Sequence, residues 1–280
     1  MALLTEEYTS LEIDRSVNAP KQNSLWLRAA QQIAFYVAYL IFGIVGVATS
    51  VGASLLALVL QSDAGRSWGQ RLIHSLFAFF VWYVRACGLL RLKAEGLEAL
   101  RGRSNLILVA NHPSLLDAVF IAAHLPNVFC LMKASLIYNI VLCGQAKLAG
   151  YVNNQSGVSL VKSCQARLRE GSNLLVFPEG TRTRGGLLGP MKMGFAVVSR
   201  SQQAPVQTLL IQYDHPFLGK DWAFFKAPPF PLHCTITLGK QFHPEACSNS
   251  QAFGREIEAY LRDAFSKSRP PGHDSTRDES

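Results

Sequence analysis

Residues 106–117 read Leu-Ile-Leu-Val-Ala-Asn-His-Pro-Ser-Leu-Leu-Asp, and this stretch decides the fold class. The five apolar residues Leu106–Ala110 have the length and composition of a buried strand. The proline that follows the histidine fits the first turn of a helix, where its missing N–H is not needed. We therefore expect a strand that ends at Ala110 and a helix over Pro113–His124.

The same alternation of strand and helix continues along the chain. Further strands are predicted at Val128–Met132, Leu174–Phe177, Val206–Tyr213 and Thr235–Leu238, and further helices at Val158–Arg169 and Gln251–Phe265. Gly171 follows the first of these helices in the position of a C-terminal cap. This order predicts an α/β fold, with a mainly parallel or mixed sheet flanked by helices.

A long uncharged stretch precedes this domain. Ile33–Leu60 holds 28 residues without a charge, and a helix needs about 20 to cross a bilayer. A buried core helix is the alternative. After a polar break over Gln61–Gln70, the apolar and aromatic residues Leu72–Val84 are too few to span and suit an interfacial or re-entrant helix. We expect an N-terminal membrane helix or helical hairpin, and the choice between one crossing and a hairpin stays open.

These patterns divide the chain into four segments. We expect a polar segment at 1–24, a membrane-anchoring helical region at 25–93, the α/β domain at 94–265 and a disordered tail at 266–280. Lys and Arg are denser after the uncharged stretch than before it, which places the α/β domain in the cytoplasm by the positive-inside rule.

Composition narrows the class of partner. Hydrophobic residues make up 49% of the 280 positions, and the formal net charge is +8. A basic balance fits an anionic membrane surface or phosphorylated small molecules. No nucleic-acid-binding motif is present, so we expect no nucleic acid partner. The six cysteines form no CxxC pair, which indicates free thiols in a reducing compartment and neither a disulfide framework nor a metal site.

His112 and Asp117 form the first candidate site. His112 would lie at the corner between the predicted strand and helix, and Asp117 about one turn into the helix, where its carboxylate can reach back to the imidazole. Such a carboxylate fixes the tautomer and leaves the other ring nitrogen as a base. The strand end is also where open α/β sheets bind ligands. The alternative is a histidine at the start of a helix whose hydrogen bonds serve only the fold.

The second candidate site is the stretch Phe-Pro-Glu-Gly-Thr-Arg-Thr-Arg at residues 177–184, again after a predicted strand. Gly180 lets the backbone approach a ligand closely, and Arg182 offers a planar fork for phosphate. Lys192 adds a second cation, and the glycines between it and Arg184 predict a flexible segment. A polar surface turn with solvated arginines is the alternative.

Together these motifs, about 65 residues apart, resemble the glycerolipid acyltransferase family, which includes the 1-acylglycerol-3-phosphate acyltransferases. Its first block, Asn-His-x4-Asp, matches Asn111, His112 and Asp117. Its third block matches Phe177–Arg182, followed by the Lys-x-Gly element that begins at Lys192. Its fourth block is similar to Ala204–Ile211. The resemblance covers roughly residues 90–215.

The resemblance implies an O-acyltransferase of phospholipid biosynthesis. His112 would be the general base and Asp117 would orient it. The acceptor head group would be bound by Glu179, Gly180, Thr181, Arg182 and Lys192. The acyl donor would be acyl-CoA or acyl carrier protein, the acceptor a lysophospholipid, and neither cofactor nor metal is expected. The protein would act among membrane lipids at a bacterial inner membrane, with its catalytic domain in the cytoplasm.

One block departs from the family pattern. The second block, Gly-x-x-Phe/Ile-x-Arg, has Gln155 where the family has an arginine that helps to hold the acceptor phosphate. A charged contact is worth about 1.5–3 kcal/mol against about 1 for a neutral one, so another lipid alcohol is an alternative acceptor. The stretch from Tyr213 to Trp222 also resembles bacterial members associated with aryl-polyene lipids. A non-catalytic lipid-binding protein and a metal hydrolase are the remaining alternatives, and the hydrolase lacks a third ligand.

Overall fold

The computed structural model describes residues 25–59, 62–133, 139–153, 157–183 and 188–267. The predicted polar segment 1–24 and most of the predicted tail therefore lie outside the described residues. So do Gln155 of the second block and the glycines at 185 and 186 that were expected to be flexible.

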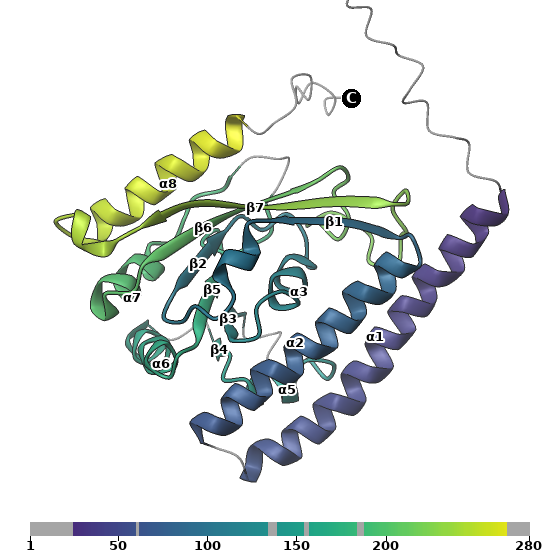
Figure 1. Ribbon diagram of the computed structural model, residues 1–280, viewed down its shortest axis with the longest axis horizontal. Coiled ribbons are helices and arrows are strands. Elements are labelled where there is room, and N and C mark those ends of the chain that lie inside the picture. The colour runs from purple at the N-terminus through teal and green to yellow at the C-terminus, as the bar shows by residue number, and fades with distance from the viewer. Residues whose placement is uncertain (1–24, 60–61, 134–138, 154–156, 184–187, 268–280) are drawn as a thin grey trace, which may run out of the picture.

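Seven strands form one mixed sheet in the order β1-β7-β6-β2-β5-β3-β4 (Figure 1). Their bounds are β1 Leu90–Glu95, β2 Ile107–Ala110, β3 Val128–Met132, β4 Val152–Asn153, β5 Asn173–Val176, β6 Val206–Tyr213 and β7 Leu232–Phe242. Only the β6–β7 pair is antiparallel, and every other neighbouring pair is parallel. The predicted α/β class and mixed sheet are confirmed.

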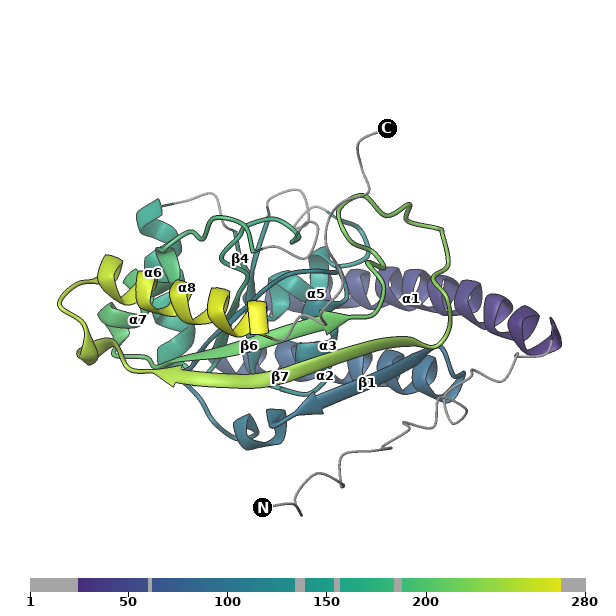
Figure 2. The ribbon, with the colours of Figure 1, turned by 90° about the horizontal axis from the view of Figure 1, so that it is seen from above.

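Helices cover both faces of the sheet. The bounds are α1 Leu25–Val59, α2 Asp63–Ala86, α3 Asp117–Ala122, α5 Cys143–Leu148, α6 Gly157–Arg169, α7 Gly194–Gln202 and α8 Ser250–Lys267, with 3-10 turns at Leu97–Leu100 and Pro244–Ala246. Figure 2 shows α6, α7 and α8 grouped together, with α1 at the opposite side of the molecule.

The strand pattern explains this layering. Successive residues of a strand point to opposite faces, and in β2 they divide between two cores. Leu108 and Ala110 belong to the core under α1, α2 and α3. Ile107 and Val109 belong to the core under α6, α7 and α8. Burial on both faces makes a central parallel strand apolar at every position, which is the signal the sequence carried.

The N-terminal region differs from expectation in its boundaries. The helix α1 runs for 35 residues and begins eight residues before the uncharged stretch. The second helix, α2, begins inside the predicted polar break, because the Ser62 hydroxyl accepts from Gly65 N and caps it. The strand β1 was not predicted, and the boundary expected between residues 93 and 94 falls inside it.

The helix predicted over Pro113–His124 is shorter than expected. It begins at Asp117, and the residues from Pro113 to Leu116 form a turn, so Pro113 does not occupy the first turn of a helix. Side chains close this turn: Asp117 accepts from Ser114 N, and the Ser114 hydroxyl accepts from Leu116 N.

Candidate active site

Three neighbouring parallel strands bring the candidate residues to one edge of the sheet. The strands β6, β2 and β5 lie side by side and run in the same direction. Tyr213 ends β6, Asn111 and His112 follow β2, and Phe177 follows β5. The two motifs predicted from the sequence therefore meet at the carboxyl edge, where ligands bind in open α/β sheets.

The predicted contact between His112 and Asp117 is present. The imidazole Nδ1 lies 2.8 Å from Asp117 Oδ2. That carboxylate is fully buried, and it also accepts from Ser114 N at 2.8 Å and from the Tyr213 hydroxyl at 2.8 Å. Since a carboxylate that faces these donors acts as an acceptor, Nδ1 carries the proton and Nε2 is left as the basic nitrogen.

Burial acts against the charge of this carboxylate. Removal from water raises the pKa of the Asp117 carboxyl, while the hydrogen bonds from His112, Ser114 and Tyr213 act in the opposite direction. Burial and the nearby Asp117 raise the pKa of Tyr213 well above its ordinary value. The phenol therefore stays protonated and remains a donor to the carboxylate.

Two further neighbours fix the position of the imidazole. The Phe177 ring stacks on His112, with centroids 4.0 Å apart and planes inclined by 17°. The side chain of Asn111 donates to Ile211 O and accepts from Ile211 N, both at 2.8 Å. This buried amide ties the end of β2 to β6, so the histidine begins from a rigid point of the sheet.

Glu179 faces the protein interior. Its carboxylate accepts from His112 N at 3.3 Å, from the Thr183 hydroxyl at 2.6 Å and from Gly189 N at 2.9 Å. Thr183 N in turn donates to His112 O at 2.7 Å. These contacts join the third motif to the first, and the expected role of Glu179 in binding the acceptor head group stays a prediction.

The two cationic residues of this region differ in their surroundings: Arg182 is bonded to backbone carbonyls, and Lys192 is exposed. The guanidinium of Arg182 donates through Nη1 to Leu218 O at 2.9 Å and to Gly219 O at 2.8 Å. Lys192 is exposed, and its Nζ would lie 3.1 Å from a Cβ placed on Gly180. Thr181 is exposed beside them. Gly180, Thr181 and Arg182 lie between Glu179 and Thr183, which both bond the His112 backbone, and Lys192 lies beside Gly180.

Three residues at this edge were missed as site candidates. Tyr213 contacts Asp117, Phe177 contacts His112, and the exposed Lys133 follows β3, the other neighbour of β5. Tyr213 and Lys133 each come directly at the end of a predicted parallel strand. That position is the signal that could have identified them, whereas Phe177 read only as the last apolar residue of its strand.

Of the cysteines, Cys234 reaches this arrangement, since its thiol is hydrogen-bonded to the Tyr213 side chain and its pKa is raised by burial and by the nearby Asp117. All six are free, and Cys130, Cys164 and Cys234 are buried. Among the described residues, no three His, Cys, Asp or Glu side chains gather where they could hold a metal ion.

Known proteins resemble this chain in sequence and fold. A 1-acyl-sn-glycerol-3-phosphate acyltransferase of Helicobacter pylori is 30% identical over 112 residues, which cover 38% of this chain and 47% of the relative. Lysophosphatidylcholine acyltransferase 2B of Rattus norvegicus is 24% identical over 257 residues, covering 84% of this chain and 49% of the relative. The chain thus spans about half the length of these relatives.

The fold agrees with a solved structure. The crystal structure of the 1-acyl-sn-glycerophosphate acyltransferase PlsC from Thermotoga maritima aligns with a TM-score of 0.64, over 88% of this chain and 98% of that one, at 17% identity. The family model described as Acyltransferase matches residues 91–212, the part that contains both motifs. Residues 91–212 are therefore similar to the acyltransferase family, within a fold like that of PlsC.

Proposed function

We propose that this protein is an O-acyltransferase that moves a fatty acyl group from a thioester to a hydroxyl of a lysophospholipid. The observation that carries the proposal is the His112 imidazole, held through Nδ1 by the buried Asp117 at the same sheet edge as Arg182 and Lys192. The names of the two curated relatives, a 1-acyl-sn-glycerol-3-phosphate and a lysophosphatidylcholine acyltransferase, support the same reaction class.

The geometry assigns a role to each part of the pair. His112 Nε2 removes the proton from the acceptor hydroxyl as its oxygen attacks the thioester carbonyl carbon. The imidazolium that forms is stabilised by the Asp117 carboxylate, and it returns the proton to the thiolate when the carbon–sulfur bond breaks. The products are the ester and the free thiol, of coenzyme A or of acyl carrier protein.

The acceptor in this proposal carries a phosphate. Lys133 is an exposed cation at the carboxyl end of β3. Lys192 is an exposed cation beside Gly180 of the third motif. Arg182 has one nitrogen engaged by backbone carbonyls and retains further N–H donors in its fork. These cations can hold a phosphate without the second-block arginine that Gln155 replaces.

An uncharged lipid alcohol, such as an aryl-polyene or glycolipid precursor, is the second candidate acceptor. The observation in its favour is that same replacement, since a glutamine brings hydrogen bonds and no charge. The reaction and the roles of His112 and Asp117 would be unchanged.

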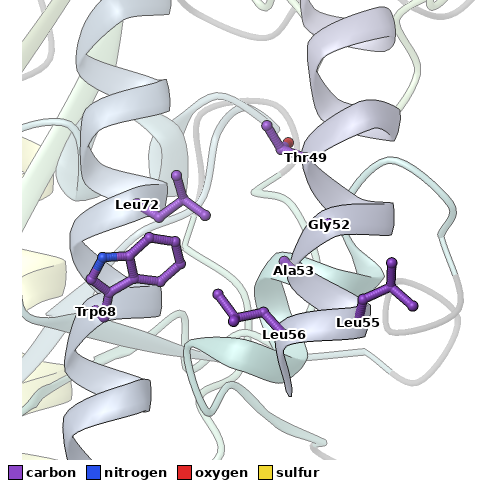
Figure 3. Close-up of a pocket in the computed structure, with 7 residues that line it drawn as sticks. All are labelled: Thr49, Gly52, Ala53, Leu55, Leu56, Trp68 and Leu72. Carbon is purple, nitrogen blue, oxygen red and sulfur yellow. The ribbon is translucent and has the colours of Figure 1, made fainter. Parts of the chain in front are cut away.

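The long helix α1 supports a place at the membrane. By length and composition it is a candidate span over Leu25–Ala57. Exposed apolar side chains follow one side of it, among them Leu25, Trp26, Ile33, Leu40, Ile44, Val51 and Leu55. An open apolar groove of about 560 Å³ lies between α1 and α2 (Figure 3). It is lined by Thr49, Gly52, Ala53, Leu55, Leu56, Trp68 and Leu72, none of which belongs to the catalytic motifs.

The docking of α1 favours a helix that lies along one leaflet. Gln31 donates to Gly88 O near one end of the helix, Gln145 donates to Gly46 O in its middle, and Ala57 packs on Leu148 near the other end. Gln31 and Ala57 are about 39 Å apart along a helix axis. The hydrocarbon core is about 30 Å thick. A crossing helix would therefore pull part of the α/β domain into hydrocarbon, so we place the pair α1–α2 flat on the cytoplasmic leaflet of the inner membrane.

A substrate panel tests the proposed function. Membranes containing the full chain are supplied with radiolabelled acyl-CoA or acyl carrier protein and with lysophosphatidate, lysophosphatidylcholine or an uncharged lipid alcohol. We expect the labelled ester to form with lysophosphatidate above the level of control membranes. Ester formed only with the uncharged alcohol would favour the second candidate, and no ester with any pair would leave a lipid-binding protein that is not an enzyme.

A further inference from the structure

The connection between β6 and β7, residues 214–231, exposes two adjacent aromatic rings. Phe224 is 53% exposed and Phe225 is 68% exposed. The two rings contact each other edge to face, with centroids 5.1 Å apart. Large neighbouring aromatic side chains on a surface indicate an interaction site.

This connection is bound to α1 through its backbone and its rings. The Tyr39 hydroxyl donates to Phe224 O at 2.8 Å, and the Tyr36 hydroxyl donates to Phe225 O at 3.3 Å. Behind these bonds, the Phe35 ring contacts Phe217 at 5.9 Å between centroids. The exposed phenylalanines are therefore fixed at the part of α1 that presents its own exposed apolar residues.

Exposed apolar residues of α1 lie next to the two rings, because the Tyr39 ring of α1 contacts both of them. On α1, Ile33 is 66% exposed, Tyr36 is 49% exposed and Leu40 is 60% exposed. Tyr36 links the two parts, because its ring is on α1 and its hydroxyl bonds to the backbone that carries Phe225. The rings thus extend the surface that already fits a membrane.

Polar groups border the two rings as at a membrane interface. The exposed Lys220 and Lys226 flank them, with Asp221 as the single acid in between. The Lys226 ammonium lies over the Trp222 ring, 5.2 Å from its centroid, and Trp222 Nε1 donates to Lys226 O. Tryptophan and lysine beside exposed apolar rings are typical of segments at headgroup level, where lysine meets anionic lipids.

The same connection is joined to the candidate active site. Leu218 O accepts from Leu115 N at 3.2 Å and from Arg182 Nη1 at 2.9 Å. Leu218 itself is buried, with its backbone in the left-handed region at φ 51°. One side of the connection thus holds the arginine of the third motif, and the other side carries the exposed rings.

We propose that Phe224 and Phe225 enter the headgroup region of the same leaflet as α1, so that the connection is a second contact with an anionic lipid surface. Because it also holds Arg182 and the turn after His112, this contact fixes the mouth of the site against the membrane. The inference concerns membrane contact alone and does not depend on the acyl acceptor.

Fluorine NMR tests the proposal at single positions. The residue 4-trifluoromethylphenylalanine replaces Phe225, Leu40 or Val197 in turn, in the full chain bound to nanodiscs of phosphatidylcholine and phosphatidylglycerol. Leu40 reports on α1, and the exposed Val197 lies on α7, on the other face of the sheet. We expect a lipid with a spin label near its headgroup to remove the signals from positions 225 and 40. A soluble gadolinium chelate should remove the signal from position 197 alone.

Each other outcome overturns the proposal in a distinct way. Loss of the signal from position 225 with the chelate, while position 40 responds to the lipid label, would leave α1 in the membrane and the connection in water. A signal from position 225 that resists both reagents would indicate a protein partner over the rings. A response of position 40 to the chelate would refute membrane contact for both elements, whatever the result of the acyltransferase assay.

Discussion

Replacing Tyr213 with phenylalanine removes a single hydroxyl from the buried end of the His112–Asp117 pair. That hydroxyl donates to Asp117 Oδ1 at 2.8 Å, and the carboxylate is fully buried. Its hydrogen bond acts to lower the pKa of the Asp117 carboxyl against the effect of burial. The variant should therefore hold the proton on the pair more tightly, and the acid limb of the pH profile should move to higher pH.

The size of this shift follows from the energy of one hydrogen bond to a charged group. A hydrogen bond to a charged group is worth about 1.5–3 kcal/mol. One pKa unit corresponds to about 1.4 kcal/mol. The shift is thus about 1–2 pH units if the proton goes to Asp117, and smaller if it goes to His112, because the pair titrates as a unit.

The assay is the pH dependence of kcat/KM for acyl transfer, measured with wild-type and Tyr213→Phe protein. Tyr260→Phe is the matched control, since that hydroxyl accepts from Lys240 N, away from the His112–Asp117 pair. The control should keep the wild-type profile. An unchanged acid limb in Tyr213→Phe, or a shift to lower pH, would refute the role given to Tyr213.

Three further changes test other parts of the account. Lys133→Gln should raise KM for lysophosphatidate about 10- to 100-fold, the equivalent of one charged contact of about 1.5–3 kcal/mol; KM values that change equally for an uncharged acceptor would contradict a phosphate contact. Gly180→Ala should lower the melting temperature and the transfer rate, because Gly180 has φ +66° and the new methyl group would lie 3.1 Å from Lys192 Nζ; wild-type values for both would show that the turn relaxes freely. Burial alone would raise the pKa of Glu170, but hydrogen bonds from two arginines outweigh burial and lower this pKa. The Glu170 carboxylate therefore stabilises the fold above its unfolded pKa of about 4.3. This stabilisation is lost as the pH falls through the pKa of Glu170 in the folded protein. Glu170→Gln should accordingly lower the melting temperature at neutral pH and differ less from wild type in acid, and a difference that grows in acid would reverse the sign of the argument.

The parts of the fold with a strong local signal could be predicted from the sequence. The strands β3 and β6 have the predicted bounds, because central strands buried on both faces leave short apolar runs. The strand β1 was missed because Leu90–Glu95 alternates apolar and charged residues directly after an aromatic helix. The strand β1 pairs with β7, which is distant in the sequence, and such long-range pairing cannot be predicted from a local sequence pattern.

The candidate site was predictable in part for the same reason. His112 and Asp117 are close in sequence, so their contact follows from local geometry. The hydroxyl of Tyr213 reaches the same carboxylate from 96 residues away, through the pairing of β6 with β2. The inward direction of Glu179 likewise depends on partners in two other segments. Contacts of this kind become visible only when the sheet is assembled.

The most direct test of the central claim is acyl transfer by the His112→Ala protein, measured beside a His243→Ala control. His243 is an exposed histidine just after the end of β7, and it has no contact with the catalytic motifs among the described hydrogen bonds. We expect His112→Ala to accumulate in membranes at the wild-type level and to lose acyl transfer, while His243→Ala retains both. Transfer at the wild-type rate by a membrane-bound His112→Ala protein would contradict the assignment of His112 as the base.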